Sequence, residues 1–160
     1  MTSLLLGSRT ASARQDIALL LGRIALGIVL IAHGWQKLFT FGLSGVAASF
    51  DQMDVPLATA SATFAAVVEL VGGILLIAGL LVPLVGLLVA VDMAGALLFV
   101  HARNGVFVDA GGFELVMVIG ALGVLYAGLG AGAYSVDRFI PRRANGESDR
   151  ASSRSRVSAR

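Results

Sequence analysis

The sequence contains no cysteine among its 160 residues. This absence excludes disulfide bonds, cysteine-held iron–sulfur clusters and thiol catalysis within the chain. Charged residues are also scarce, at 14% of the sequence against about 25% in a typical soluble domain. Apolar residues make up 57% and the mean hydropathy is +0.87. The composition therefore indicates a protein embedded in a lipid bilayer, and the length indicates a single compact unit.

Other signals are missing as well. The only cluster of basic residues is a polar C-terminal stretch without an aromatic platform, which excludes nucleic-acid binding. The glycine-rich segment GLGAGAY follows no predicted strand and is not a dinucleotide fingerprint. Residues 1–15 hold only a three-leucine apolar run, too short for a signal peptide. We expect insertion through the first membrane helix, and we assign no metal site.

Four apolar segments have lengths that suit a hydrocarbon core of about 30 Å. The long apolar run after Glu69 exceeds one crossing, and Pro83 supplies the break. The segment GVAASFDQM reads as a short surface helix after the first crossing. We therefore predict an all-α membrane protein, a four-helix transmembrane bundle in up-down-up-down order over residues 16–137. The expected helices cover about 16–39, 58–81, 84–100 and 113–134.

The two ends of the chain are polar and rich in arginine and serine. We expect residues 1–15 and 138–160 to be disordered, and Asp16 to cap the first helix. Nine arginines lie in these flanks, whereas the loops on the opposite side offer only Lys37 and Arg103. The positive-inside rule then places both termini in the cytoplasm. This placement requires an even number of crossings, and four satisfies it.

Three ionisable residues interrupt the apolar segments: Arg23, Glu69 and Asp92. A charge facing lipid near the bilayer centre costs at least about 2.5–3.5 kcal/mol, so we expect all three to face inward as a buried polar network. Small residues around Glu69 allow another helix to come close. Two interpretations stay open: a structural ion pair of Arg23 with Glu69 or Asp92, and a proton relay or anion site.

A second polar group is expected at the outer ends of the helices. An imidazole can exchange protons near neutral pH, so this group is a candidate ligand or proton-transfer site. The candidate catalytic residues are His33, Glu69 and Glu114, and the candidate cofactor-binding residues are His33, Trp35, Lys37, His101 and Glu114. The nearby aromatic residues, Trp35, Phe39, Phe41 and Phe107, form either an interfacial belt or a flat surface for a quinone ring.

An ordered set of residues across the four segments resembles the DoxX family of small bacterial four-helix membrane proteins. The set comprises Arg23, Gly27, His33-Gly34 with Lys37, Glu69 with Gly72-Gly73, His101 with Asn104-Gly105, and Gly112 with Glu114. The resemblance covers about residues 17–137, and it implies residence in the bacterial cytoplasmic membrane. It also implies an association with quinol or thiosulfate oxidation, or with defence against oxidative stress.

Several functions are compatible with these residues. The first is a membrane subunit that binds a quinone and works with soluble or membrane redox partner proteins, since the chain has no obvious electron carrier of its own. The second is a non-catalytic scaffold that anchors partner proteins. A small-solute transporter, which would need a homo-oligomer, and a haem held by His33 and His101 are lesser alternatives.

Overall fold

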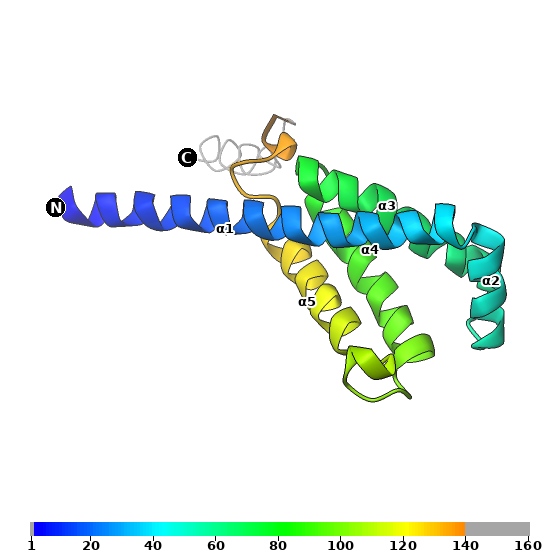
Figure 1. Ribbon diagram of the computed structural model, residues 1–160. Coiled ribbons are helices and arrows are strands. Elements are labelled where there is room, and N and C mark those ends of the chain that lie inside the picture. The colour runs from blue at the N-terminus through cyan, green and yellow to red at the C-terminus, as the bar shows by residue number, and fades with distance from the viewer. Residues whose placement is uncertain (1, 140–160) are drawn as a thin grey trace, which may run out of the picture.

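The computed structural model describes residues 2–139 and contains only helices there (Figure 1). The predicted all-α fold is therefore confirmed for this part of the chain. The predicted tail 138–160 lies almost wholly outside the described residues. The elements are α1 (Thr2–Trp35), η1 (Gln36–Thr40), α2 (Leu43–Gln52), α3 (Ala58–Ala78), α4 (Val82–Gly95), η2 (Ala96–His101), η3 (Val108–Ala110), α5 (Glu114–Leu129) and η4 (Val136–Phe139).

The helices pack as two pairs, α1 with α3 and α4 with α5, while α2 lies against α3 (Figure 1). Within each pair the backbones come very close. A Cβ atom placed on Gly73 would lie 2.8 Å from the Gly27 carbonyl oxygen, and one on Gly86 would lie 2.6 Å from the Gly123 carbonyl oxygen. Such approaches need residues without side chains. The predicted packing role of the small residues near Glu69 is confirmed.

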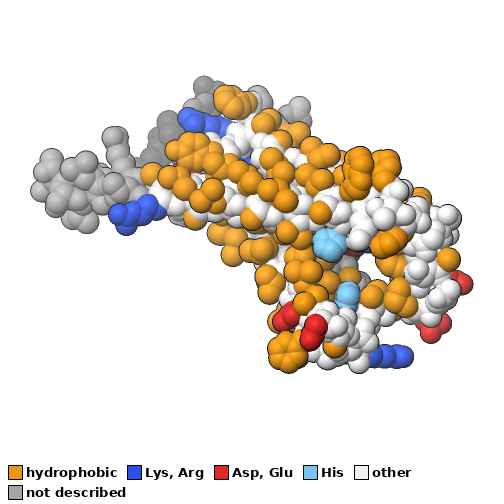
Figure 2. All heavy atoms as spheres, in the orientation of Figure 1, with side chains coloured by type: hydrophobic (Ala, Val, Ile, Leu, Met, Phe, Trp, Pro, Cys, Tyr) orange, Lys and Arg blue, Asp and Glu red, His pale blue; other side chains and the backbone are white. Residues whose placement is uncertain are grey.

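Three helical segments are long and apolar enough to cross a membrane: Ser12–Thr40, Ala58–Ala78 and Val82–His101. A fourth apolar helix, α5, has 16 residues and measures about 24 Å at 1.5 Å per residue. Large apolar side chains are exposed on all four, among them Ile28, Val71, Leu87 and Val124. Extensive exposed apolar surface, seen over the face in Figure 2, is the surface that a bilayer would cover.

The ends of the helices differ from the prediction in two places. The turn between α3 and α4 lies at residues 79–81, before the proline, because Gly79 adopts a left-handed φ of 73° that closes α3. Pro83 sits in the first turn of α4, where its missing N–H costs nothing. The fourth helix ends at Leu129 instead of near residue 134, because Gly130 has a φ of 74°.

The N-terminal segment also differs from expectation, since α1 begins at Thr2 and runs through residues that we expected to be disordered. The segment has no proline and several good helix formers, so it can extend the helix that follows it. Asp16 therefore lies inside α1 and does not cap it. Its Oδ1 instead accepts a hydrogen bond of 2.9 Å from the Ala133 backbone N–H. The predicted short helix before the second crossing is confirmed as α2.

Candidate ligand-binding cavity

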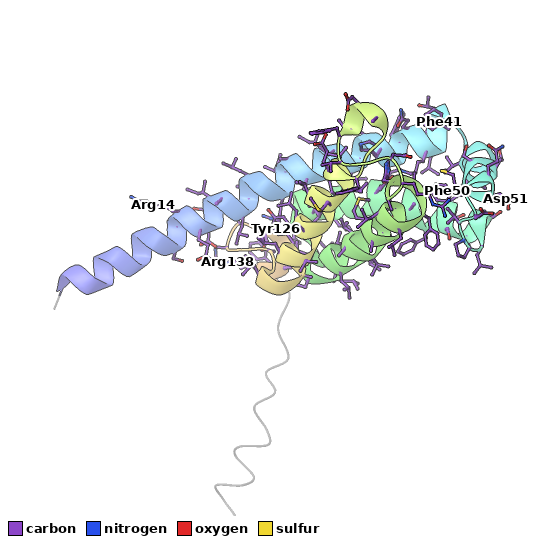
Figure 3. The ribbon with its side chains drawn as sticks, turned by 90° about the horizontal axis from the view of Figure 1, so that it is seen from below. Arg14, Phe41, Phe50, Asp51, Tyr126 and Arg138 are labelled. Carbon is purple, nitrogen blue, oxygen red and sulfur yellow. The ribbon has the colours of Figure 1, made fainter. Side chains whose placement is uncertain are left out.

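A cavity of about 260 Å³ lies between α2, α3 and the α4–η2 helix, at the end of α1. Most of its lining is apolar, and three phenylalanines, Phe50, Phe64 and Phe99, contribute to its walls. Phe50 comes from α2, whose neighbouring Asp51 lies on the outer side of the molecule (Figure 3). The space-filling view shows the surface hollowed in this region (Figure 2).

Three charged residues line this cavity, Lys37 from η1, Glu69 from α3 and Asp92 from α4. Lys37 Nζ donates a hydrogen bond to Glu69 Oε2 at 2.5 Å, and the two side chains are 19% and 6% exposed. Charge-assisted hydrogen bonds of this kind are short and strong. The pair joins the first and second long apolar helices within a largely apolar wall.

Among the described residues, Asp92 differs from Glu69 in having no cationic partner of its own. The residue is 8% exposed, and its Oδ2 atom is buried without a hydrogen-bond partner in the part of the chain that the structure describes. Buried polar atoms normally have a hydrogen-bond partner, so the unpaired carboxyl oxygen of Asp92 beside a cavity needs a physical explanation.

The residues predicted as one buried polar network fall into two separate sites. Arg23, Glu69 and Asp92 are all buried, as predicted. Arg23, however, donates from Nη1 to the Leu76 carbonyl oxygen at 3.3 Å and from Nη2 to the Tyr134 carbonyl oxygen. Of the two interpretations left open, the ion pair of Arg23 with either acid is therefore wrong. The last carbonyls of a helix lack partners within it and carry partial negative charge, so the end of α3 attracts the guanidinium.

Glu114 and His101 hold the loop between η2 and α5. Glu114 Oε1 accepts a hydrogen bond of 2.7 Å from the Val108 N–H, and His101 Nδ1 donates to the Gly111 carbonyl oxygen at 2.7 Å. Neither residue lines the cavity. Their predicted roles in proton transfer and cofactor binding are untested, and the structure gives both a local structural role.

His33 and Trp35 lie on a different surface from the cavity. They line a shallow hollow on the outside of α1 together with Ile28 and Gln36. Trp35 is 55% exposed, and its ring centroid lies 4.2 Å from that of Phe39. Of the predicted cofactor-binding residues, only Lys37 lines the cavity, and the cofactor-binding role of the others stays a prediction.

The aromatic walls of the cavity were missed in the sequence. Phe99 follows Asp92 by seven residues, a spacing that puts both on one face of a helix, so this signal was available. Phe50 carries no such signal, because its place depends on how α2 folds back onto α3.

Both π-helical turns of the described chain border the cavity. Lys37 belongs to η1, and Ala96, Phe99 and Val100 belong to η2. A π-helical turn is rare and is frequently found at functional sites. The described residues contain no group of three or more His, Asp or Glu that could hold a metal ion.

Comparison with known proteins adds a family assignment. The family model for DoxX matches residues 18–102. An uncharacterized membrane protein of Mycobacterium tuberculosis is 31% identical, with 76% of this chain and 80% of that protein covered. An uncharacterized protein of Haemophilus influenzae is 33% identical, with 72% and 84% covered. A Bacillus subtilis protein named "Putative oxidoreductase CatD" is 33% identical, with 55% and 63% covered. No solved structure matches the chain.

Proposed function

The chain belongs to the DoxX family, and from this premise we propose that it binds the headgroup of a lipid-soluble quinone in the cavity. In this role it is the membrane subunit of an oxidoreductase assembly, and a partner protein supplies the electrons. The proposal includes four crossings of the bacterial cytoplasmic membrane with both termini in the cytoplasm. The relationship to a protein named as an oxidoreductase supports a redox role.

The single observation that carries the proposal is the Lys37–Glu69 pair inside a cavity with aromatic walls. Ligand pockets are mostly apolar and contain a few convergent polar groups that orient the ligand. A quinone presents a flat ring with a carbonyl oxygen on each side. The Lys37 ammonium has three N–H groups, and after bonding Glu69 it retains donors for such an oxygen.

The size of the cavity sets the part of the ligand that it holds. A volume of about 260 Å³ lies just below the range of about 300–1,000 Å³ for pockets that enclose drug-sized molecules. It suits a single substituted ring, with the isoprenoid tail left among the lipid chains. The exposed apolar residues on α3 and α4, such as Ile74 and Leu87, provide a surface for that tail.

The proposal is tested by measuring the quinone that co-purifies with the full chain in lipid nanodiscs. The double variant Lys37→Met/Glu69→Leu removes both charges together, so that no unpaired charge disturbs folding, and we expect its quinone content to fall at least five-fold. Arg103→Met, in the outer loop, serves as the control and should retain quinone. Wild-type protein without quinone, even after addition of a soluble analogue, would refute the proposal and favour the scaffold.

A further inference from the structure

The charges that line the cavity do not balance if all three groups are ionised. Lys37 and Glu69 neutralise each other at 2.5 Å, which leaves the charge of Asp92 uncompensated. Among residues 2–139, no other ionisable side chain lines the cavity. An isolated carboxylate in apolar surroundings is very costly, and the group normally takes up a proton instead.

The hydrogen bonding of Asp92 agrees with a neutral carboxyl group. Its Oδ2 is buried without a partner among the described residues. A charged oxygen left in this state loses far more solvation energy than the carbonyl oxygen of a neutral carboxyl. Because Oδ2 is shielded, Oδ1 is the oxygen through which Asp92 can reach a ligand, and the proton on that oxygen makes it a donor.

We propose that Asp92 is the specificity-determining contact of the cavity and donates a hydrogen bond, as a neutral carboxyl, to a carbonyl oxygen of an uncharged ligand. This inference rests on the proposed quinone site and adds the second donor that such a ligand needs. Lys37 and Asp92 come from different helices, η1 and α4. Both residues then donate hydrogen bonds to the quinone ring. The cavity rejects lipophilic cations because it holds no net negative charge.

Binding of decylubiquinone, measured by titration of the full chain in nanodiscs, tests the donor. Asp92→Asn keeps the shape and an N–H donor, so its dissociation constant should stay within about three-fold of wild type. Asp92→Leu removes the donor and should weaken binding roughly ten-fold. Asp51→Asn, on the outer side of α2 (Figure 3), is the matched control and should be unchanged. An Asn variant as weak as the Leu variant would overturn the proposal.

Infrared difference spectroscopy tests the protonation state without relying on a ligand. We expect a C=O stretching band of a neutral carboxyl in the wild-type protein that is absent from Asp92→Asn and shifts when decylubiquinone binds. Absence of that band would overturn the inference even if quinone binds, whereas its presence without quinone binding would refute only the proposed function. Tetraphenylphosphonium, a lipophilic cation, should bind wild type and Asp92→Asn equally. Tighter binding to wild type would show an ionised Asp92.

Discussion

Lys37 is the most consequential single residue of the cavity because its charge is matched by one nearby acid. Its side chain is 19% exposed and that of Glu69 is 6% exposed, so removing either partner leaves the other in apolar surroundings. Buried pairs contribute little relative to apolar residues of similar size, but breaking one by removing a single partner is strongly destabilising. The Lys37–Glu69 pair should therefore respond very differently to single and double substitution.

We expect Lys37→Met to lower the free energy of unfolding by about 3 kcal/mol, and Lys37→Met/Glu69→Leu to return it to within about 1 kcal/mol of wild type. Unfolding in mixed detergent can be followed through the fluorescence of the single tryptophan. Arg103→Met provides the control, because it removes an exposed cation from the outer loop. Equal losses of unfolding free energy in the single and double variants would contradict this account. They would show that the lost Lys37–Glu69 contact, and not an unpaired buried charge, causes the destabilisation.

For single residues, the sequence predicted which charged side chains are buried, but it did not predict their hydrogen-bond partners. The cost of a charge in lipid correctly placed Arg23, Glu69 and Asp92 inside. The partner of Arg23 turned out to be backbone carbonyl oxygens, including that of Leu76. Backbone groups have no signature in the sequence. A carbonyl oxygen of α3 is free to accept a hydrogen bond from Arg23 only near the end of the helix. That end is set by the backbone conformation of Gly79.

Among the helices, contact between α4 and α5 depends on two glycines that face each other. A Cβ on Gly86 would lie 2.6 Å from the Ala127 backbone nitrogen, and a Cβ on Gly123 would lie 2.8 Å from the Gly86 carbonyl oxygen. The atoms in the way belong to the backbone, so they cannot move aside as a flexible side chain would. Gly128 on the same helix α5 has nothing within 4 Å of the corresponding position.

These two environments predict opposite results for the same substitution. Gly86→Ala should destabilise the protein by about 1–3 kcal/mol, because it overpacks a closed helix contact. Gly128→Ala should be neutral or stabilise by up to about 1 kcal/mol, because alanine has a higher helix propensity than glycine and has room in the last turn of α5. Detergent unfolding curves of the two variants measured side by side provide the comparison. A destabilising Gly128→Ala together with a neutral Gly86→Ala would contradict this account of the α4–α5 contact.

The sequence predicted the existence of the helices better than their ends. Apolar length alone identified the three long spans, since a bilayer demands it. The ends at Ala78 and Leu129 depend on glycines with a positive φ at positions 79 and 130. Each glycine lies in an apolar run that contains other glycines, so composition does not reveal which one adopts that conformation.

At the scale of the whole molecule, the two ends of the helix bundle differ. Polar contacts join the segments at the end that holds the α3–α4 turn, and the cavity lies at the other end. Near the turn between α3 and α4, Asp137 accepts hydrogen bonds from the Leu81 N–H at 2.7 Å and the Val82 N–H at 3.1 Å. It thereby caps α4 from a distant part of the chain. The segment after α5 lies along this end in Figure 1, where Arg23 and Asp16 also bind it. The cavity lies at the opposite end of α1, beside η1 and η2.

This polarity makes the proposed four-span topology testable, because a chain without cysteine accepts single cysteines without background labelling. In intact spheroplasts, a membrane-impermeant maleimide should label Arg103→Cys, in the loop after η2, and Asp51→Cys, on α2. Arg138→Cys, an exposed position at the closed end, should react only after permeabilisation. The positive-inside rule places the arginine-rich end in the cytoplasm, and α5 must cross the membrane to bring residue 138 there. Labelling of Arg103→Cys and Arg138→Cys from the same side would show that α5, at about 24 Å, does not cross.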